Sequence, residues 1–268
     1  MGFESILYDV TDGVATITLN RPERHNAFNV AMAWELADAW ARVKSDPAVV
    51  CAIVTGAGPR AFCTGMDLGD VSAGGTPAAS VPTERDGKPF HRYLTAIQNR
   101  CWKPVITALN GMVVGGGFHF VADSDLVLAA EHATFLDTHV KVGLVAAFEP
   151  VGLARRIPLE AVLRLALLGG SERMDAATAL RIGLVGEVLP ADRLLPRARE
   201  LAGLIAQHSP AALAATKRAI WESLDVGLEE GLERAAKILD AHNDHPDLVE
   251  GPRAFVEKRR PRWAPYRA

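Results

Sequence analysis

The sequence has few cysteines and none of the segments that mark a secreted or membrane-spanning protein. Cys51, Cys63 and Cys101 are odd in number, widely spaced and without a C-x-x-C pair. This pattern argues against a disulfide framework and against a structural zinc site. No basic segment followed by an apolar core opens the chain, and no run of eighteen apolar residues occurs in it. We therefore expect a cytoplasmic protein with no membrane partner.

Several catalytic motifs are also missing. The chain contains no G-x-S-x-G, no G-x-x-x-x-G-K-[ST] and no H-E-x-x-H. Their absence argues against a nucleophile-elbow serine hydrolase, a P-loop nucleotide site and a zinc protease. The net charge of −3 gives no reason to expect nucleic acid as a partner. We expect neither a bound metal ion nor a cofactor.

A triple glycine within residues 110–119 is the most informative feature that is present. It lies between an apolar run at 104–109, which resembles a strand, and a helix-compatible segment that begins at Phe118. Glycine lets the backbone approach a ligand closely and leaves amide N–H groups bare where a helix begins. Such groups stabilise a developing negative charge. On a helix, His119 would face the same ligand as the amide of Gly116, three residues earlier.

The first part of the chain alternates between strand-like and helix-like patterns. Runs at 6–10 and 14–19 are joined across Asp12-Gly13, which predicts a hairpin. Asn29 is placed to cap a helix whose apolar stripe predicts amphipathic packing. Further patterns predict buried strands at 49–54, 104–109 and 126–130, a helix over 90–101, and a surface loop, a candidate lid, at 71–89.

After residue 159 the pattern becomes helical. Apolar periodicity predicts helices at 161–168, 176–182, 194–207, 211–224 and 228–242. The fold class is therefore α/β, with a core that contains a parallel sheet and with a helical C-terminal region.

Two strand-to-helix turns each offer a backbone N–H, as a two-donor oxyanion hole requires. One is Gly65-Met66-Asp67, and the other is centred on Gly116. With these turns, the chain resembles the enoyl-CoA hydratase/isomerase (crotonase) family. The resemblance also rests on further segments, namely 19–22 (LNRP), 26–29 (NAFN), 55–58 (TGAG), 61–68 (AFCTGMDL), 123–126 (DSDL), 179–185 (ALRIGLV) and 255–261 (FVEKRRP).

The resemblance implies a crotonase-like spiral of ββα turns. It divides the chain into a spiral core, residues 1–195, and a helical trimerisation region, residues 196–268. It further implies a homotrimer or a dimer of trimers. The small-molecule substrate would be an acyl-CoA thioester, so that coenzyme A enters as part of the substrate and not as a cofactor.

The resemblance also assigns site residues. The amides of Met66 and Gly116 would hold the thioester oxygen as an enolate forms. The residues implied to bind coenzyme A are Arg24, His25, Ala27, Ala61, Thr64, Gly65, Asp67, Leu68 and, from the cationic tail, Lys258.

The sequence departs from the family at both catalytic glutamates, whose positions are occupied by His119 and His139. Histidine can carry protons there, since its reference pKa of about 6.5 lies near operating pH. Glu149 is placed to orient one of the histidines, although it also fits a plain helix cap. Asp137 is a second candidate, because in a strand it would face the same side as His139.

Three functions fit these residues. The first is an enoyl-CoA hydratase or isomerase in which His119 and His139 move the protons and Glu149 polarises one of them. The second is a C–C bond hydrolase acting on a β-diketone, because Asp137-Thr138-His139 resembles the His/His/acid set of such relatives. The third is a non-catalytic acyl-CoA binding protein that has lost its glutamates.

Overall fold

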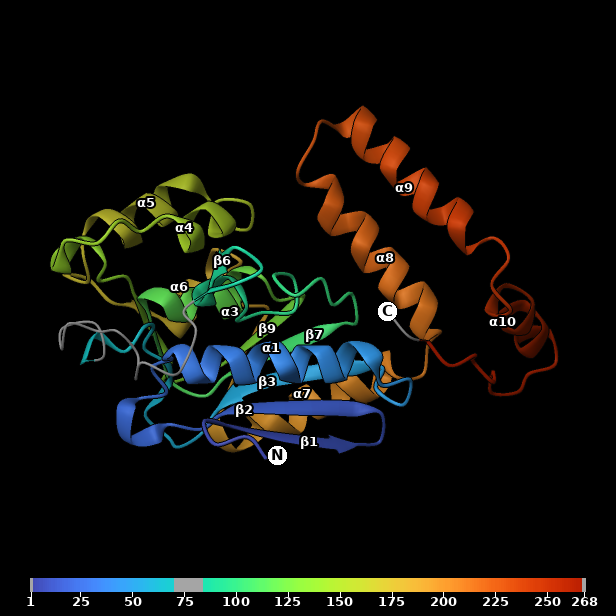
Figure 1. The fold of residues 1–268 in the computed structure, drawn as a ribbon, viewed down its shortest axis with the longest axis horizontal. Helices are drawn as coiled ribbons and strands as arrows, with labels where there is room; N and C mark the ends of the chain where they lie inside the picture. Colours follow the sequence, from blue (N-terminus) through green and yellow to red (C-terminus); the bar gives the residue numbers. More distant parts are fainter. Residues whose placement is uncertain (1, 70–83, 267–268) are drawn as a thin grey trace.

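The computed structural model describes residues 2–69 and 84–266. In this part of the chain a six-stranded sheet forms the base of the molecule (Figure 1). Its strands, in spatial order, are β1 (Ile6–Thr11), β2 (Val14–Leu19), β3 (Cys51–Gly56), β7 (Val105–Leu109), β9 (Leu126–Ala130) and β12 (Glu187–Leu189). The β1–β2 hairpin is antiparallel, and every later neighbour pairs in parallel.

A second sheet takes the alternate strands. Its spatial order is β11 (Met174–Asp175), β10 (Thr134–Leu136), β8 (Met112–Val114) and β4 (Ala61–Cys63), of which β10, β8 and β4 run in parallel. The successive pairs β3–β4, β7–β8 and β9–β10 each contribute one strand to each sheet. The chain therefore advances as a spiral of repeated turns. A short hairpin, β5 (Glu84–Arg85) with β6 (Lys88–Pro89), stands apart.

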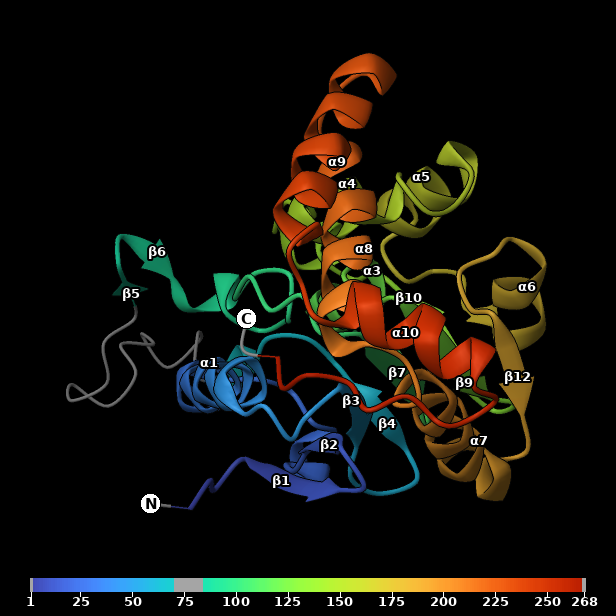
Figure 2. The ribbon, with the colours of Figure 1, turned by 90° about the vertical axis from the view of Figure 1, so that its right-hand side faces the viewer.

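The six-stranded sheet is covered on both faces, because its side chains alternate between two cores. On β3, Cys51 and Ile53 pack with α7 (Ala191–Ile205), while Ala52 and Val54 join the larger core that contains α1 (Val30–Ser45). Figure 2 shows α1 and α7 on opposite sides of β2 and β3.

Shorter helical segments connect the strands. They are η1 (Pro22–Arg24), η2 (Phe90–Arg92), η3 (Gly115–Phe118), α3 (His119–Ala122), η4 (Val140–Val142), α4 (Phe148–Leu153), α5 (Leu159–Leu167) and α6 (Ala176–Arg181). None of the helices in the described ranges is long and apolar enough to cross a membrane.

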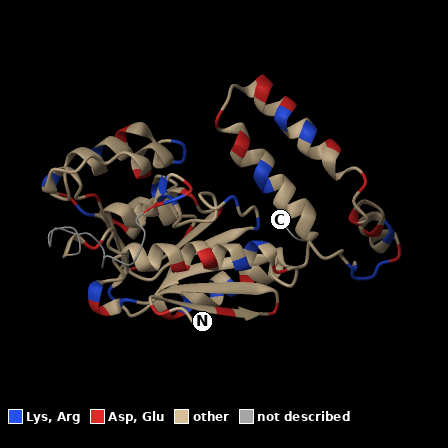
Figure 3. Ribbon diagram, in the orientation of Figure 1, with Lys and Arg blue, Asp and Glu red and all other residues tan. Residues whose placement is uncertain are grey.

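Three helices at the C-terminal end project from the spiral (Figure 1). They are α8 (Pro210–Ser223), α9 (Leu228–His242) and α10 (Asp247–Val256). Figure 3 shows basic and acidic residues interspersed along α8 and α9. Large apolar side chains are nevertheless exposed on this arm, including Leu228 at 82% and Phe255 at 85%.

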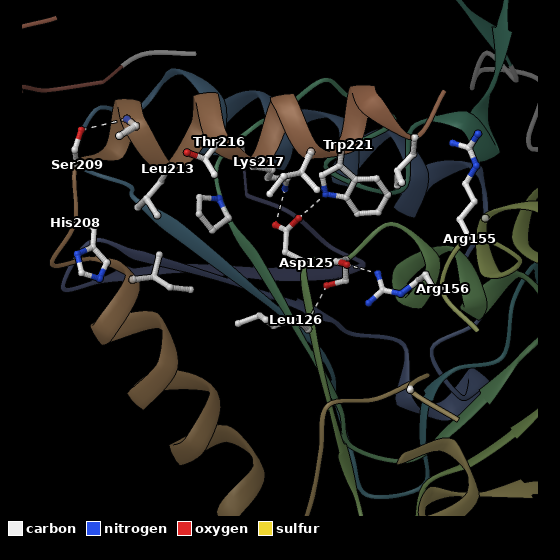
Figure 4. Close-up of a pocket in the computed structure, with 18 residues that line it drawn as sticks. Asp125, Leu126, Arg155, Arg156, His208, Ser209, Leu213, Thr216, Lys217 and Trp221 are labelled. Atoms are coloured by element: carbon white, nitrogen blue, oxygen red, sulfur yellow. Dashed lines mark hydrogen bonds and ion pairs between the residues drawn. The ribbon is translucent and has the colours of Figure 1, made fainter. Parts of the chain in front are cut away.

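A buried polar cluster fastens α8 to the sheet. The Lys217 ammonium lies 2.7 Å from an Asp125 carboxylate oxygen and donates to the Lys103 carbonyl at 2.9 Å, while the Trp221 indole donates to Asp125 at 2.7 Å. Figure 4 shows Lys217 and Trp221 directed from α8 toward Asp125. A pocket of about 700 Å³ adjoins this cluster, and the triple glycine and its histidine are not among its lining residues.

The structure confirms most predicted elements. The hairpin turns at Asp12-Gly13, and α1 (Val30–Ser45) begins where the Asn29 side chain accepts a hydrogen bond from the Met32 amide at 2.9 Å. The predicted helix at 228–242 has the bounds of α9. The fold class is α/β, with parallel sheets and a helical C-terminal region.

The predicted helix over 90–101 is wrong. The structure has only the single turn η2 there, followed by irregular turns. The Gln98 side chain accepts a hydrogen bond from the Leu94 amide at 2.8 Å, which takes the donor away from a helical ladder. Arg100 has a left-handed φ of 52°, which an α-helix does not allow.

Two other expectations concern segment boundaries. The boundary predicted between 195 and 196 falls inside α7, which packs on the sheet, and the projecting arm begins only at Pro210. Most of the predicted lid at 71–89 lies outside the described residues, and its final part forms the β5–β6 hairpin.

The polar cluster on α8 leads to a stability prediction. Lys217→Met keeps the apolar stem but leaves the Asp125 carboxylate without its cation, which we expect to destabilise the protein by about 3 kcal/mol. Lys237→Met, on the exposed side of α9, is the matched control and should cost less than about 0.5 kcal/mol. Thermal unfolding at one protein concentration measures both, and equal midpoints would contradict the assigned role of Lys217.

Candidate active site

The candidate site lies where three neighbouring strands end. β4, β8 and β10 are adjacent and parallel, so their carboxyl ends lie along one edge of the second sheet. Met66 follows β4, Gly116 follows β8 and His139 follows β10. Residues far apart in the sequence are thereby placed at one edge, which is where open parallel sheets bind ligands.

The first two turns touch through their backbones. A Cβ atom added to Gly65 would lie 2.8 Å from the Gly116 nitrogen, and one added to Gly116 would lie 3.3 Å from the Gly65 Cα. Gly65 also has a left-handed φ of 83°, which favours glycine. A Cβ at Gly117 would overlap the Cys63 carbonyl. The glycines are therefore required for the two turns to pack together.

The amides of Met66 and Gly116 lie at these turns. Phe28 pairs with the first turn by donating to the Gly65 carbonyl and by accepting from the Asp67 amide, which leaves the intervening Met66 amide outside the pairing. Gly116 is the second residue of η3, where a helical amide has no acceptor within its own helix. Among the described hydrogen bonds outside helices and strands, neither amide is a donor.

Two histidines flank one carboxylate beside these turns. Glu149 Oε1 lies 3.1 Å from His119 Nε2 and 4.0 Å from His139 Nε2. His119 is 4% exposed and Glu149 is 5% exposed. The His139 ring packs against Gly115, where an added Cβ would lie 3.3 Å from its Cε1. The sequence-predicted residues His119, His139 and Glu149 therefore form one cluster, and Glu149 is not a plain surface cap.

Asp137 holds the second histidine. Its Oδ1 accepts from the His139 backbone amide at 2.9 Å and lies 2.8 Å from the His139 Nδ1. Strand β10 ends at Leu136, so the expectation that both residues share a strand face is wrong, and a tight turn makes the contact instead. The hydrogen bond to Asp137 raises the pKa of His139, with added help from the charges of Asp137 and Glu149 and against the effect of burial.

Burial alone would raise the pKa of the Glu149 carboxyl. Burial is the largest single effect, but the hydrogen bond from His119, the charges of His119 and His139 and a backbone hydrogen bond together outweigh it and hold the pKa of Glu149 below its ordinary value. The carboxylate form is therefore favoured inside a closed site.

Sequence reasoning did not identify Gln98. Its Nε2 lies 3.2 Å from the His119 Nδ1, on the side of the ring opposite Glu149. An isolated glutamine carries no motif, and its approach to His119 depends on the irregular turns at 93–100. No sequence signal was available for it.

The predicted coenzyme A residues are partly brought together. His25 and Ala61 line one pocket of about 310 Å³, and the His25 carbonyl accepts from the Thr64 hydroxyl at 3.4 Å. Asp67 instead forms an ion pair with Arg21 at 3.0 Å, which ties the first turn to the segment after β2. The remaining predicted residues in this region are Arg24 and Leu68, both exposed, and buried Ala27, with Gly65 at the turn itself.

Lys258 is not near these residues within one chain. It follows α10, which lies at the opposite end of the molecule from η1 (Figure 1). Its neighbour Arg259 is paired with Glu250 and Glu257 at 2.6 Å each, so the cationic tail is partly neutralised.

Nucleophilic catalysis by a cysteine and chemistry on a bound metal ion find little support in the site. Burial raises the pKa of the Cys63 thiol to about 12, which leaves it a packed side chain and not a nucleophile. Across residues 2–69 and 84–266, no group of three or more His, Cys, Asp and Glu side chains is arranged to hold a metal ion.

Comparison with known proteins places this geometry in a family. The family model for enoyl-CoA hydratase/isomerase matches residues 9–265. An (E)-benzylidenesuccinyl-CoA hydratase of Thauera aromatica is 36% identical over 96% of this chain and 97% of that protein. A 1,2-epoxyphenylacetyl-CoA isomerase of Escherichia coli is 35% identical over 97% and 98%.

A solved structure agrees over the same length. The crystal structure of an enoyl-CoA hydratase/isomerase from Mycobacterium paratuberculosis is 40% identical, with a TM-score of 0.91 over 99% of this chain and 100% of that one. Its similarity covers both sheets and the projecting helices. The chain therefore belongs to the enoyl-CoA hydratase/isomerase family, and it has the crotonase fold.

Proposed function

We propose that the protein is an acyl-CoA hydratase or isomerase whose catalytic group is a His/Glu/His cluster. The observation that carries this proposal is the contact between the Gly65 and Gly116 turns, directly beside the cluster of His119, Glu149 and His139. The amides of Met66 and Gly116 are the two donors of an oxyanion hole for the thioester oxygen. Relatives named as hydratases and isomerases of acyl-CoA esters support the substrate class.

His139 is the base in this proposal. Asp137 accepts the Nδ1 proton of the neutral ring, which leaves the Nε2 lone pair directed toward Glu149 and the site. In hydration, Nε2 takes a proton from water while the water oxygen bonds to the β-carbon and the electron pair moves onto the thioester oxygen. The enolate is held by the two amides, and its α-carbon then takes a proton from the cluster.

A second candidate function is C–C bond hydrolysis of a β-diketone. The Asp137–His139 contact favours it, because an Asp–His pair can activate water for attack on a carbonyl carbon. The oxyanion hole would then hold the departing enolate. A non-catalytic acyl-CoA binding protein is a poorer fit, since such a role needs no buried proton-transfer cluster.

The C-terminal arm is proposed to join three chains. Leu228 and Phe255 are apolar side chains that the single chain leaves exposed, as are Leu232, Leu239, Val249 and Val256. Exposed apolar surface of this extent marks a protein–protein interface. A homotrimer, alone or as a dimer of trimers, would also bring a neighbour's Lys258 closer to a coenzyme A site.

Hydration of crotonyl-CoA and longer enoyl-CoA esters tests the main proposal. We expect turnover by the wild type, and a loss of about 10²- to 10⁴-fold in kcat for His139→Ala, because the base is removed. His208→Ala, an exposed histidine in the pocket next to α8, should keep full activity. Turnover of a cyclic β-diketone without coenzyme A, and none of any enoyl-CoA ester, would favour the second candidate instead.

The pH profile tests the pairing of His139 with Asp137. A base must be neutral, and the pKa of His139 is raised, so activity should fall on the acid side at a higher pH than an ordinary histidine would give. Asp137→Asn removes the charge that stabilises the imidazolium, so the acid limb of kcat/KM should move to lower pH. Acid limbs at the same pH in the wild type and in Asp137→Asn would show that the pairing of His139 with Asp137 does not set the pH profile.

Sedimentation equilibrium tests the role of the arm. We expect a mass of three or six chains, and dissociation toward single chains when Phe255→Ser removes an exposed apolar contact of α10. Leu7→Ser is the control, since Leu7 is exposed on β1, away from the arm. A wild type that sediments as a monomer would disprove trimerisation.

A further inference from the structure

The side-chain amide of Gln98 has one orientation only. Its Oε1 accepts hydrogen bonds from the backbone amides of Leu94 at 2.8 Å and of Thr95 at 3.4 Å. If the group were rotated by half a turn, its NH₂ would face these two N–H donors. The oxygen therefore points to the turn, and the NH₂ points to His119 at 3.2 Å.

This orientation fixes the tautomer of His119. An NH₂ group can only donate, so the His119 Nδ1 that faces it must present a lone pair. The ring proton is then on Nε2, where it is donated to Glu149 Oε1 at 3.1 Å. A second proton on Nδ1 would face the Gln98 NH₂, which is a donor and offers it no acceptor.

A neutral histidine in this state cannot carry protons through the reaction. Release of its Nε2 proton would leave an imidazolate, and the lone pair on Nδ1 is occupied by Gln98. His139 differs, because its Nδ1 faces the acceptor Asp137 and, among the described residues, no hydrogen-bond donor occupies its Nε2. The two histidines at the family's glutamate positions therefore have opposite tautomers.

We propose that Gln98 and His119 are positioning residues and that Glu149 and His139 alone exchange protons with the substrate. Gln98 donates to His119 and His119 donates to Glu149, and this chain of donors fixes the Glu149 carboxylate. This inference rests on the proposed function and deepens it. It also differs from the sequence-based expectation, in which His119 itself moves protons. Glu149 on α4 thus supplies a carboxylate to the site, in place of the family glutamate whose position His119 occupies.

The first test measures the tautomer directly and needs no substrate. Nitrogen-15 NMR of the histidine rings, with His119 assigned by its absence in His119→Gln, should show Nδ1 without a proton and Nε2 with one near neutral pH. A proton on Nδ1, in either the neutral or the charged ring, would overturn the proposal. Because activity is not involved, this result stands even if no acyl-CoA ester is turned over.

The second test separates a positioning role from proton transfer. His119→Gln offers an amide that can donate to Glu149 and accept from Gln98 but cannot carry a proton, so its kcat should stay within about tenfold of the wild type. His119→Ala removes the donor and should lose about 10²-fold, with little change in KM. If both variants fold and lose activity equally, His119 is a proton carrier and the proposal is wrong.

The third test isolates the amide of Gln98. Gln98→Glu keeps an oxygen acceptor for the Leu94 and Thr95 amides but replaces the NH₂ by a second acceptor, which draws a proton onto His119 Nδ1. We expect an unchanged unfolding temperature, a doubly protonated ring by NMR and at least about a tenfold loss in kcat. Gln207→Glu, an exposed glutamine at the end of α7, controls for the added charge. An unaltered His119 ring in Gln98→Glu would contradict the proposed chain.

Discussion

Close packing of two backbone turns is the constraint on which the site depends. The Gly65 turn and the triple-glycine turn approach so closely that a single Cβ at Gly116 would collide with the Phe28 ring as well as with Gly65. This contact lies just beyond the ends of β4 and β8, which pair in parallel with a register shift between Ala61 and Cys63. It brings the Met66 and Gly116 amides to one place, and it gives the His139 ring a flat surface at Gly115. A side chain at any of these glycines would separate the two amides that we propose to bind one thioester oxygen.

Elements with local signals were predictable from the sequence. The cap at Asn29 and the Asp12-Gly13 turn act over four residues or fewer, and both elements lie where these signals place them. The segment 90–101 has helical spacing of its apolar residues and is still irregular, because the side chain of Gln98 competes for backbone donors. Helix α10 was missed, since Pro252 inside it interrupts the usual helix pattern.

Only those site residues could be predicted from the sequence that stand at positions to which the family resemblance assigns a role. His119, His139 and Glu149 could be named from the sequence, and the structure places both histidines beside the same carboxylate oxygen of Glu149. Gln98 could not be predicted, because its contact with His119 depends on irregular turns in a segment whose apolar spacing indicates a helix. The contact of Asp137 with the backbone amide and the Nδ1 of His139 likewise depends on where β10 ends. Such contacts are set by turns of a few residues, for which a single sequence carries the weakest signal.

The histidines and the glutamate also depend on one another. Glu149 lies 3.1 Å from His119, so a glutamate at 119 beside it would place two carboxylates within hydrogen-bond distance. One of the two would then have to stay protonated, because like charges that close cannot both ionise. The two histidines and the carboxylate on α4 therefore depend on one another in this site. Gln98 completes the set, because its NH₂ faces the His119 Nδ1 at 3.2 Å on the side of the ring opposite Glu149.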